Sequence, residues 1–136
     1  MESSATITMS SLDIARLHRL LDQAAYRHLP GADDLRDELD RAVPVAPVDV
    51  PPDIVTMNST VRFIDDSNGS TFELKLVYPA ESGKSGTVSV LAPIGSALLG
   101  LSVGQSIPWQ VPGGRQIRLR VLEVLMQPES MGDYLS

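Results

Sequence analysis

The sequence predicts an α+β protein, in which a short helical hairpin precedes a mostly antiparallel sheet that carries one short helix. Apolar residues recur at helical spacing before the proline-rich middle of the chain, and after it they alternate with polar residues as in strands. The middle holds four of the ten prolines, which is typical of a stiff, extended linker. We therefore expect a short coiled-coil hairpin over residues 1–43, a linker over 44–53 and a β-rich domain over 54–136.

Residues 11–42 predict two short helices joined by a tight turn. Ser10 and Asp13 resemble a capping box at the start of the first helix, with Asp in place of the usual Glu. Pro30 and Gly31 are expected to end that helix, because proline and glycine both disfavour helical backbone. The apolar face of the first helix is formed by Ile14, Leu17, Leu20, Leu21 and Ala24.

The second helix is expected to begin near Asp33 and Asp34, where the positive end of the helix dipole favours carboxylates. These carboxylates lie near the apex of the hairpin, so a shared divalent metal is an alternative role, although helix capping explains them without one. Each arm is only about 15 to 25 Å long, and we expect it to project from the β-rich body. The apolar stripe continues through Leu35, Leu39 and Ala42.

From residue 54 onward about five strands are predicted, most of them antiparallel. The pair Asn68-Gly69 is a strong signal for a hairpin turn between the first two strands. "GTVSVLAP", "SIPWQV" and "RQIRLRVLEVLM" supply the other strands, and "VPGGRQ" supplies a further turn. "PIGSALLG" predicts a short helix, with Pro93 in its first turn and Gly100 as its stop. In the second strand we expect Phe72, Leu74, Leu76 and Tyr78 to face inward, and Glu73 and Lys75 to face outward.

Composition and charge exclude several classes of function. The chain has 136 residues without cysteine, so disulfides and thiolate metal sites are excluded and a cytoplasmic location is expected. The formal net charge of −6 argues against binding to nucleic-acid phosphates and favours a protein partner with a basic surface. No run approaches the roughly 18 apolar residues of a membrane helix, and the first residues do not resemble a signal peptide.

Two glycine-containing stretches resemble binding loops incompletely. "GSALLGLS" has the glycine spacing of a phosphate-binding loop, but Leu101 occupies the position of the lysine that such a loop requires. We interpret Gly100 as a helix stop and Leu101 as a core residue. In "DDSNGSTFE", Gly69 does not stand at the spacing of an EF-hand calcium loop, so a plain hairpin turn is favoured.

The remaining candidates are scattered polar side chains. His18 and His28 have no carboxylate or serine at catalytic spacing; we interpret His18 as solvated and place His28 in the turn. We interpret Arg118 and Arg120, with Arg115 nearby, as residues on the solvent-facing side of the sheet. The alternative is that they contact an acidic surface of a partner. No nucleophile, base and oxyanion site come together in the sequence, so we expect a non-catalytic adaptor.

Residues 88–114 resemble the C-terminal domain of the bacterial Gre transcript-cleavage factors. A strand, a proline turn into an "ALLG" helix, the pair "VG", another strand and "PGG" follow one another in the order of that family. Over nearly the whole chain, the resemblance extends to the Gre-like family of regulators of nucleoside diphosphate kinase, the Rnk family. It rests on "LDIARLHRLLDQAAY", "LRDELDRA", "DIVTMNSTVRF", "LVYPAE" and "LAPIGSALLGL", with "QPE" and "GDYL" at the end.

This resemblance implies an FKBP-like body that docks on the rim of the secondary channel of RNA polymerase. In this chain the docking loop maps onto Leu91, Ala92, Pro93 and Ile94. The polar residue that the Gre factors carry before the proline is Ala92 here. The implied partner is therefore RNA polymerase, bound by a monomer that makes no direct sequence-specific contact with nucleic acid and does not associate with a membrane.

The resemblance also concerns the arm, whose acidic tip residues hold a catalytic magnesium in the Gre factors. The helices here are far shorter than a Gre coiled coil, so Asp33 and Asp34 are not expected to reach an active centre deep in the channel. The implied function is a non-enzymatic regulator without cofactor or metal, which competes with Gre factors and does not stimulate transcript cleavage. The alternatives are direct regulation of nucleoside diphosphate kinase and a residual prolyl isomerase activity, for which aromatic residues are scarce.

Overall fold

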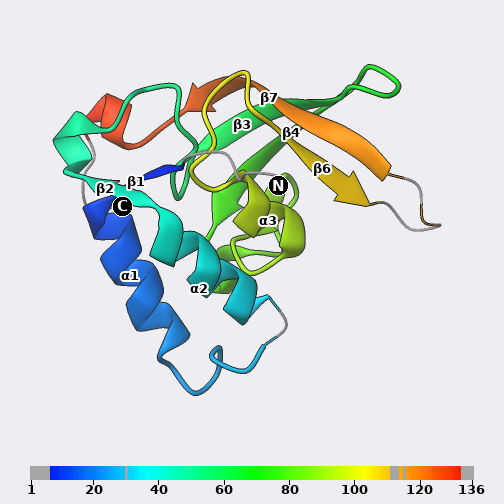
Figure 1. Ribbon diagram of the computed structural model, residues 1–136. Helices are drawn as coiled ribbons and strands as arrows, with labels where there is room; N and C mark the ends of the chain where they lie inside the picture. Colours follow the sequence, from blue (N-terminus) through cyan, green and yellow to red (C-terminus); the bar gives the residue numbers. More distant parts are fainter. Residues whose placement is uncertain (1–6, 30, 111–113, 115, 133–136) are drawn as a thin grey trace.

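Figure 1 shows the computed structural model, which describes residues 7–29, 31–110, 114 and 116–132. Five strands form a sheet in the order β5-β4-β3-β7-β6, and the helices lie on one side of it. Neighbouring strands are antiparallel except β4 and β5, which are parallel. The predicted α+β class with a mostly antiparallel sheet is therefore confirmed. The strands of this sheet are β3 (Thr60–Asp65), β4 (Ser70–Val77), β5 (Thr87–Ser89), β6 (Ser106–Gln110) and β7 (Gln116–Met126).

The helices are α1 (Ser11–Leu21), α2 (Ala32–Arg41) and α3 (Pro93–Leu98). The side chain of Ser10 caps α1, because its Oγ accepts the N–H groups of Leu12 at 3.1 Å and of Asp13 at 3.4 Å. The first helix ends earlier than predicted, and Ala24 lies in the following turn. Residues 22–25 are exposed, so no core contact holds a further helical turn. Within the described residues, no helix combines the length and the apolarity needed to cross a membrane.

A parallel pair of three-residue strands closes the base of the hairpin, and the sequence did not predict it. β1 (Thr8–Ser10) precedes α1 and pairs with β2 (Val43–Val45), which follows α2. The segment 44–53 thus contains most of β2 and a 3₁₀ helix, η1 (Pro47–Asp49). The division of the chain at this segment stays a prediction.

The helical hairpin and the sheet share one hydrophobic core. Burying a leucine contributes roughly 1.5 to 3 kcal/mol, so the buried leucines of α1 and α2 hold the hairpin against the body. The expected projecting arm is therefore corrected: the hairpin lies along the body, with α2 packed between α1 and α3 (Figure 1). The shared core includes Leu17, Leu21, Leu35 and Leu39 of the hairpin, Phe63 and Leu76 of the sheet, and Leu98 and Leu99 at the end of α3.

Two local predictions are confirmed at glycines with positive φ. Gly100 directly follows Leu99, the C-cap of α3, and has a φ of +86°. Leu101 is only 2% exposed and lies in the core, as its place after the helix stop predicted. Gly69 closes the β3–β4 hairpin with a φ of +76°, and its N–H donates to the carbonyl of Asp65 at 2.8 Å.

The inward face of β4 agrees with the prediction only near the end of the strand. Leu76 is 1% exposed, and Leu74 and Tyr78 are partly buried against the core, but Phe72 is 46% exposed. Phe72 pairs across the hairpin with Phe63, and their rings stack with centroids 5.4 Å apart. The first residues of β4 are exposed on both faces, so the alternation there no longer indicates burial.

Candidate functional site

The loop predicted to dock on a partner, residues 91–94, leads from β5 into α3. The amide of Leu91 donates to Oγ of Ser89 at 3.1 Å, and the amide of Ala92 donates to the carbonyl of Ser89 at 3.0 Å. Ala92 is the N-cap of α3, and Pro93 occupies the first helical position, where no amide donor is needed. The loop backbone is therefore held by local hydrogen bonds and by the helix that it starts.

Only part of this loop faces solvent. Leu91 is 8% exposed and belongs to the core, so its side chain serves packing. Ala92 is half-buried, and Ile94 packs against the core while remaining partly exposed. The side chain of Pro93 lies outside the described part of the structure. Among the described side chains of residues 91–94, Ala92 and Ile94 are therefore the partly exposed ones.

Asp33 and Asp34 lie in the first turn of α2, as predicted. The N-cap of this helix is Gly31 and no side-chain hydrogen bond caps it, so neither aspartate is the capping residue; both lie where the helix dipole favours carboxylates. The side chain of Asp33 is 98% exposed and lies 3.2 Å from the guanidinium of Arg36. An exposed pair of this kind contributes little to stability. In the described residues, no group of three or more acidic, histidine or cysteine side chains is placed to share a metal ion.

The start of α2 lies against the predicted docking loop, and sequence reasoning missed this contact. Gly31 has a φ of +90°, and a Cβ atom built on it would lie 2.4 Å from the carbonyl oxygen of Leu91. α2 and α3 also pack together. The one signal in the sequence was a glycine at a helix start, where Ser, Thr, Asp or Asn is usual.

A buried carboxylate joins α1 to the body. Asp13 is 3% exposed, and its Oδ2 accepts the N–H of Met57 at 3.2 Å. Burial raises the pKa of Asp13 to about 7 against the opposing effect of the Met57 amide, while Glu129 raises it further and Arg16 lowers it. Burial, and then the charge of Asp13, raises the pKa of Tyr78 to about 12. The capping-box interpretation of Asp13 was wrong, since its carboxylate faces the body.

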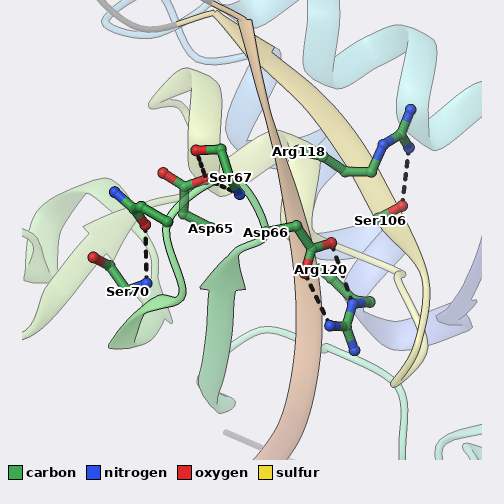
Figure 2. Close-up of polar contacts among 8 residues, drawn as sticks. Asp65, Asp66, Ser67, Ser70, Ser106, Arg118 and Arg120 are labelled. Carbon is green, nitrogen blue, oxygen red and sulfur yellow. Dashed lines mark hydrogen bonds and ion pairs between the residues drawn. The ribbon is translucent and has the colours of Figure 1, made fainter.

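The arginines of β7 lie on the solvent side of the sheet, as predicted. Figure 2 shows that Arg120 binds both carboxylate oxygens of Asp66, at 2.9 and 3.3 Å. This contact lowers the pKa of Asp66 and neutralises Arg120 within the sheet. Arg118 donates to Oγ of Ser106 at 3.0 Å (Figure 2). Arg115 lies outside the described residues, and an acidic partner for this face stays a hypothesis.

The predicted hairpin turn engages its own polar groups. Oδ1 of Asp65 accepts the amide of Ser67 at 2.9 Å and its hydroxyl at 2.6 Å (Figure 2). Oδ1 of Asn68 accepts the amide of Ser70 at 2.9 Å. Such bonds from Asp and Asn side chains stabilise turns directly. The plain hairpin-turn interpretation is therefore confirmed.

A surface hollow of about 590 Å³ lies where the end of β4 meets the C-terminal residues. Tyr78 is the one aromatic side chain among its described lining residues, which include Met126 and Met131. A prolyl isomerase pocket needs aromatic walls, so this hollow does not favour that alternative. His18 is exposed as predicted, and His28 lies in the turn between α1 and α2, where it is also exposed.

Comparison with known proteins gives matches over both halves of the chain. The family described as "Transcription elongation factor, GreA/GreB, C-term" matches residues 50–126, and the family "Rnk N-terminus" matches residues 6–45. The chain is 52% identical over 134 residues to the Regulator of nucleoside diphosphate kinase of Escherichia coli K12, covering 98% of each protein. It is 32% identical over 96 residues to Transcription elongation factor GreA of Chlorobium phaeobacteroides, covering 69% of this chain and 60% of that protein.

A solved structure shares both the sequence and the fold. The "Prokaryotic transcription elongation factor GreA/GreB from Nitrosomonas europaea" is 48% identical, with a TM-score of 0.76 over 90% of this chain and 100% of that one. The two family matches together span the hairpin, the sheet and α3. The chain therefore belongs to the Gre-factor-like family, with an Rnk N-terminus followed by a GreA/GreB C-terminal domain.

Proposed function

We propose that this protein is a non-enzymatic transcription regulator that binds RNA polymerase at the rim of the secondary channel. The loop of residues 91–94 docks on the polymerase, and the protein competes there with Gre factors without stimulating transcript cleavage. It acts as a cytoplasmic monomer and needs no metal or cofactor. Family membership supports this proposal, because the matched C-terminal domain is that of transcription elongation factors.

The observation that carries the proposal is the contact between the start of α2 and the docking loop. Gly31 lies against the carbonyl of Leu91, so Asp33 and Asp34 sit beside the docking surface and not beyond it. α1 and α2 have 11 and 10 residues, which corresponds to about 15 Å each. Catalytic magnesium needs carboxylate oxygens at about 2 Å, and this arm cannot bring them tens of ångströms into a channel. Occupancy of the channel without cleavage is the outcome that this geometry allows.

Charge supports a protein partner. The net charge of −6 repels nucleic-acid phosphates, and on the exposed side of the sheet Arg62 and Arg120 are already paired with acidic side chains of the same chain. A basic protein surface at the mouth of a channel is the complementary partner.

The test is direct binding to core RNA polymerase. We expect the protein to be retained on immobilised polymerase at micromolar concentration and to be displaced by an added Gre factor. Stalled elongation complexes should show no increase in transcript cleavage. Absence of binding at this concentration, or binding that a Gre factor does not displace, would contradict the proposal.

A matched pair of variants locates the docking surface. Ala92→Arg places a large cation on the half-buried loop residue, whereas Ala15→Arg makes the same change on the exposed side of α1. We expect Ala92→Arg to weaken polymerase binding at least tenfold, on the order of 1.4 kcal/mol, and Ala15→Arg to bind like the wild type. Equal binding by both variants would mean that the loop is not the docking surface.

Direct regulation of nucleoside diphosphate kinase is the second candidate, favoured by the name of the E. coli relative that is 52% identical. If regulation runs through transcription, adding the purified protein to purified kinase should leave the rate of phosphate transfer unchanged. A change in kinase turnover that depends on protein concentration would instead support a direct contact.

A further inference from the structure

Two glycines, one at the start of α2 and one in α3, lie against the backbone of residues 89–91, where the chain enters the docking loop. On one side, Gly31 at the start of α2 faces the carbonyl of Leu91, with 2.4 Å between that oxygen and a built Cβ. On the other side, Gly95 in α3 faces the carbonyl of Ser89, with 2.1 Å between that oxygen and a built Cβ. Two helices from opposite halves of the chain thus approach the same short stretch of backbone more closely than any side chain would allow.

Strand β4 also holds this stretch of backbone, through a hydrogen bond to Val90. The amide of Val90 donates to the carbonyl of Val77 in β4 at 2.9 Å, and Val90 is fully buried. Ser89 accepts two amides of the loop, through its hydroxyl and through its carbonyl. One flank of the loop is therefore held by α3 and β4, which belong to the C-terminal half. The other flank, at Leu91, is held by the hairpin.

We infer that the helical hairpin supports the docking loop, with Gly31 as the positioning residue through which α2 sets the conformation of Leu91 and Ala92. What the loop binds rests on the proposed function. The hairpin in this protein is therefore part of the docking unit, and a displacement of α2 moves the surface that the partner contacts.

Packing explains why a small change at Gly31 reaches the loop. Ala32 is 1% exposed and Leu35 is fully buried, so α2 cannot tilt away from the body without opening the core. A methyl group at Gly31 needs on the order of 1 Å of additional space from the Leu91 carbonyl. Ala92, the next residue after Leu91, is only half-buried, so we expect the loop to move before the packed helix does.

The test compares Gly31→Ala with Gly83→Ala. Both glycines have a left-handed φ, +90° and +99°, but a Cβ on Gly83 would meet no atom within 4 Å. Backbone strain is thus matched, and only Gly31→Ala adds the clash with Leu91. We expect the hydrogen exchange of the Leu91 and Ala92 amides to rise at least tenfold in Gly31→Ala, while Gly83→Ala leaves it unchanged. Equal exchange at these amides in both variants would overturn the inference.

Polymerase binding gives the second readout. Gly31→Ala should bind at least tenfold more weakly than Gly83→Ala although both remain folded by circular dichroism. If the wild type itself fails to bind polymerase, the proposed function is wrong, and the exchange comparison still decides whether the hairpin supports the loop. If wild type and Gly31→Ala bind equally, the support has no role in docking.

A milder variant covers the case in which Gly31→Ala does not fold. The guanidinium of Arg36 donates to the carbonyl of Leu21 at 3.0 Å and so ties α2 to α1 at the partly exposed edge of the hairpin. Arg36→Ala loosens the hairpin without touching the loop. We expect faster exchange at the Leu91 and Ala92 amides as well as within the hairpin. Faster exchange confined to the hairpin would contradict the inference.

Discussion

Replacing Asp13 by Asn is expected to stabilise the protein at pH 8 by up to about 4 kcal/mol, with little effect near pH 4. The wild-type carboxylate is almost fully buried between α1 and the body, where its charged form loses hydration. One amide, that of Met57, compensates only part of this loss. Asn fills the same space, accepts the same N–H through its Oδ1 and carries no charge.

The direction in which the free energy of unfolding changes with pH follows from the number of protons bound in the folded and unfolded states. In the unfolded chain Asp13 loses its proton near pH 3.8, whereas in the folded protein it holds the proton up to about pH 7. Between these values the folded state binds more protons, so the free energy of unfolding falls as the pH rises. The contribution of Asp13 is complete below pH 3.8 and is lost above about pH 7. The groups that face it are Glu129, Arg16 and Tyr78.

Urea unfolding of wild type and Asp13→Asn between pH 4 and pH 8 measures this difference. Asp66→Asn is the control, because Asp66 is exposed and Arg120 lowers the pKa of its carboxyl. The control difference should therefore stay constant between pH 6 and pH 8, well above the ordinary pKa of an aspartate, whereas the Asp13→Asn difference should change there. Asp13→Ala should be less stable than Asp13→Asn by about 1 to 3 kcal/mol at every pH, since it leaves the Met57 amide unpaired. A wild type more stable than Asp13→Asn at pH 8 would contradict the prediction.

The features that the sequence predicted correctly depend on neighbouring residues. Gly100 ends α3 and Gly69 closes a hairpin because left-handed backbone is accessible to glycine, which is a property of the residue itself. The burial of Leu101 follows from its place directly after the helix stop.

The features that the sequence did not predict depend on partners far along the chain. Asp13 stands three residues after a helix cap and resembles part of that cap, but its partner is the amide of Met57. Gly31 resembles a helix breaker, but it also lies so close to the carbonyl of Leu91 that a larger residue would collide with it. The strands β1 and β2 have three residues each, too few for a period-two pattern to emerge.

Gly95, which lies in α3, is distinguished by the same argument from Gly104, which lies in the turn before β6. Gly95 lies inside α3, where Ala would ordinarily stabilise a helix by about 1 kcal/mol. A Cβ at this position would lie 2.1 Å from the carbonyl oxygen of Ser89 and 2.9 Å from its carbonyl carbon. Both atoms belong to the backbone of Ser89, the last residue of β5, so no side-chain rotation can relieve the contact. The steric cost therefore outweighs the gain in helix propensity.

Gly95→Ala is expected to destabilise the protein by about 3 kcal/mol, the upper part of the range for overpacking in a close-packed interior. The melting temperature should fall by on the order of 10 °C. Gly104→Ala is the comparison variant: Gly104 has a φ of +93°, unlike Gly95, but a Cβ on it would meet no atom within 4 Å. Its cost is the strain of left-handed backbone, about 1 kcal/mol. A Gly95→Ala protein as stable as Gly104→Ala would mean that α3 can move away from Ser89, and the close approach would then not define the docking loop.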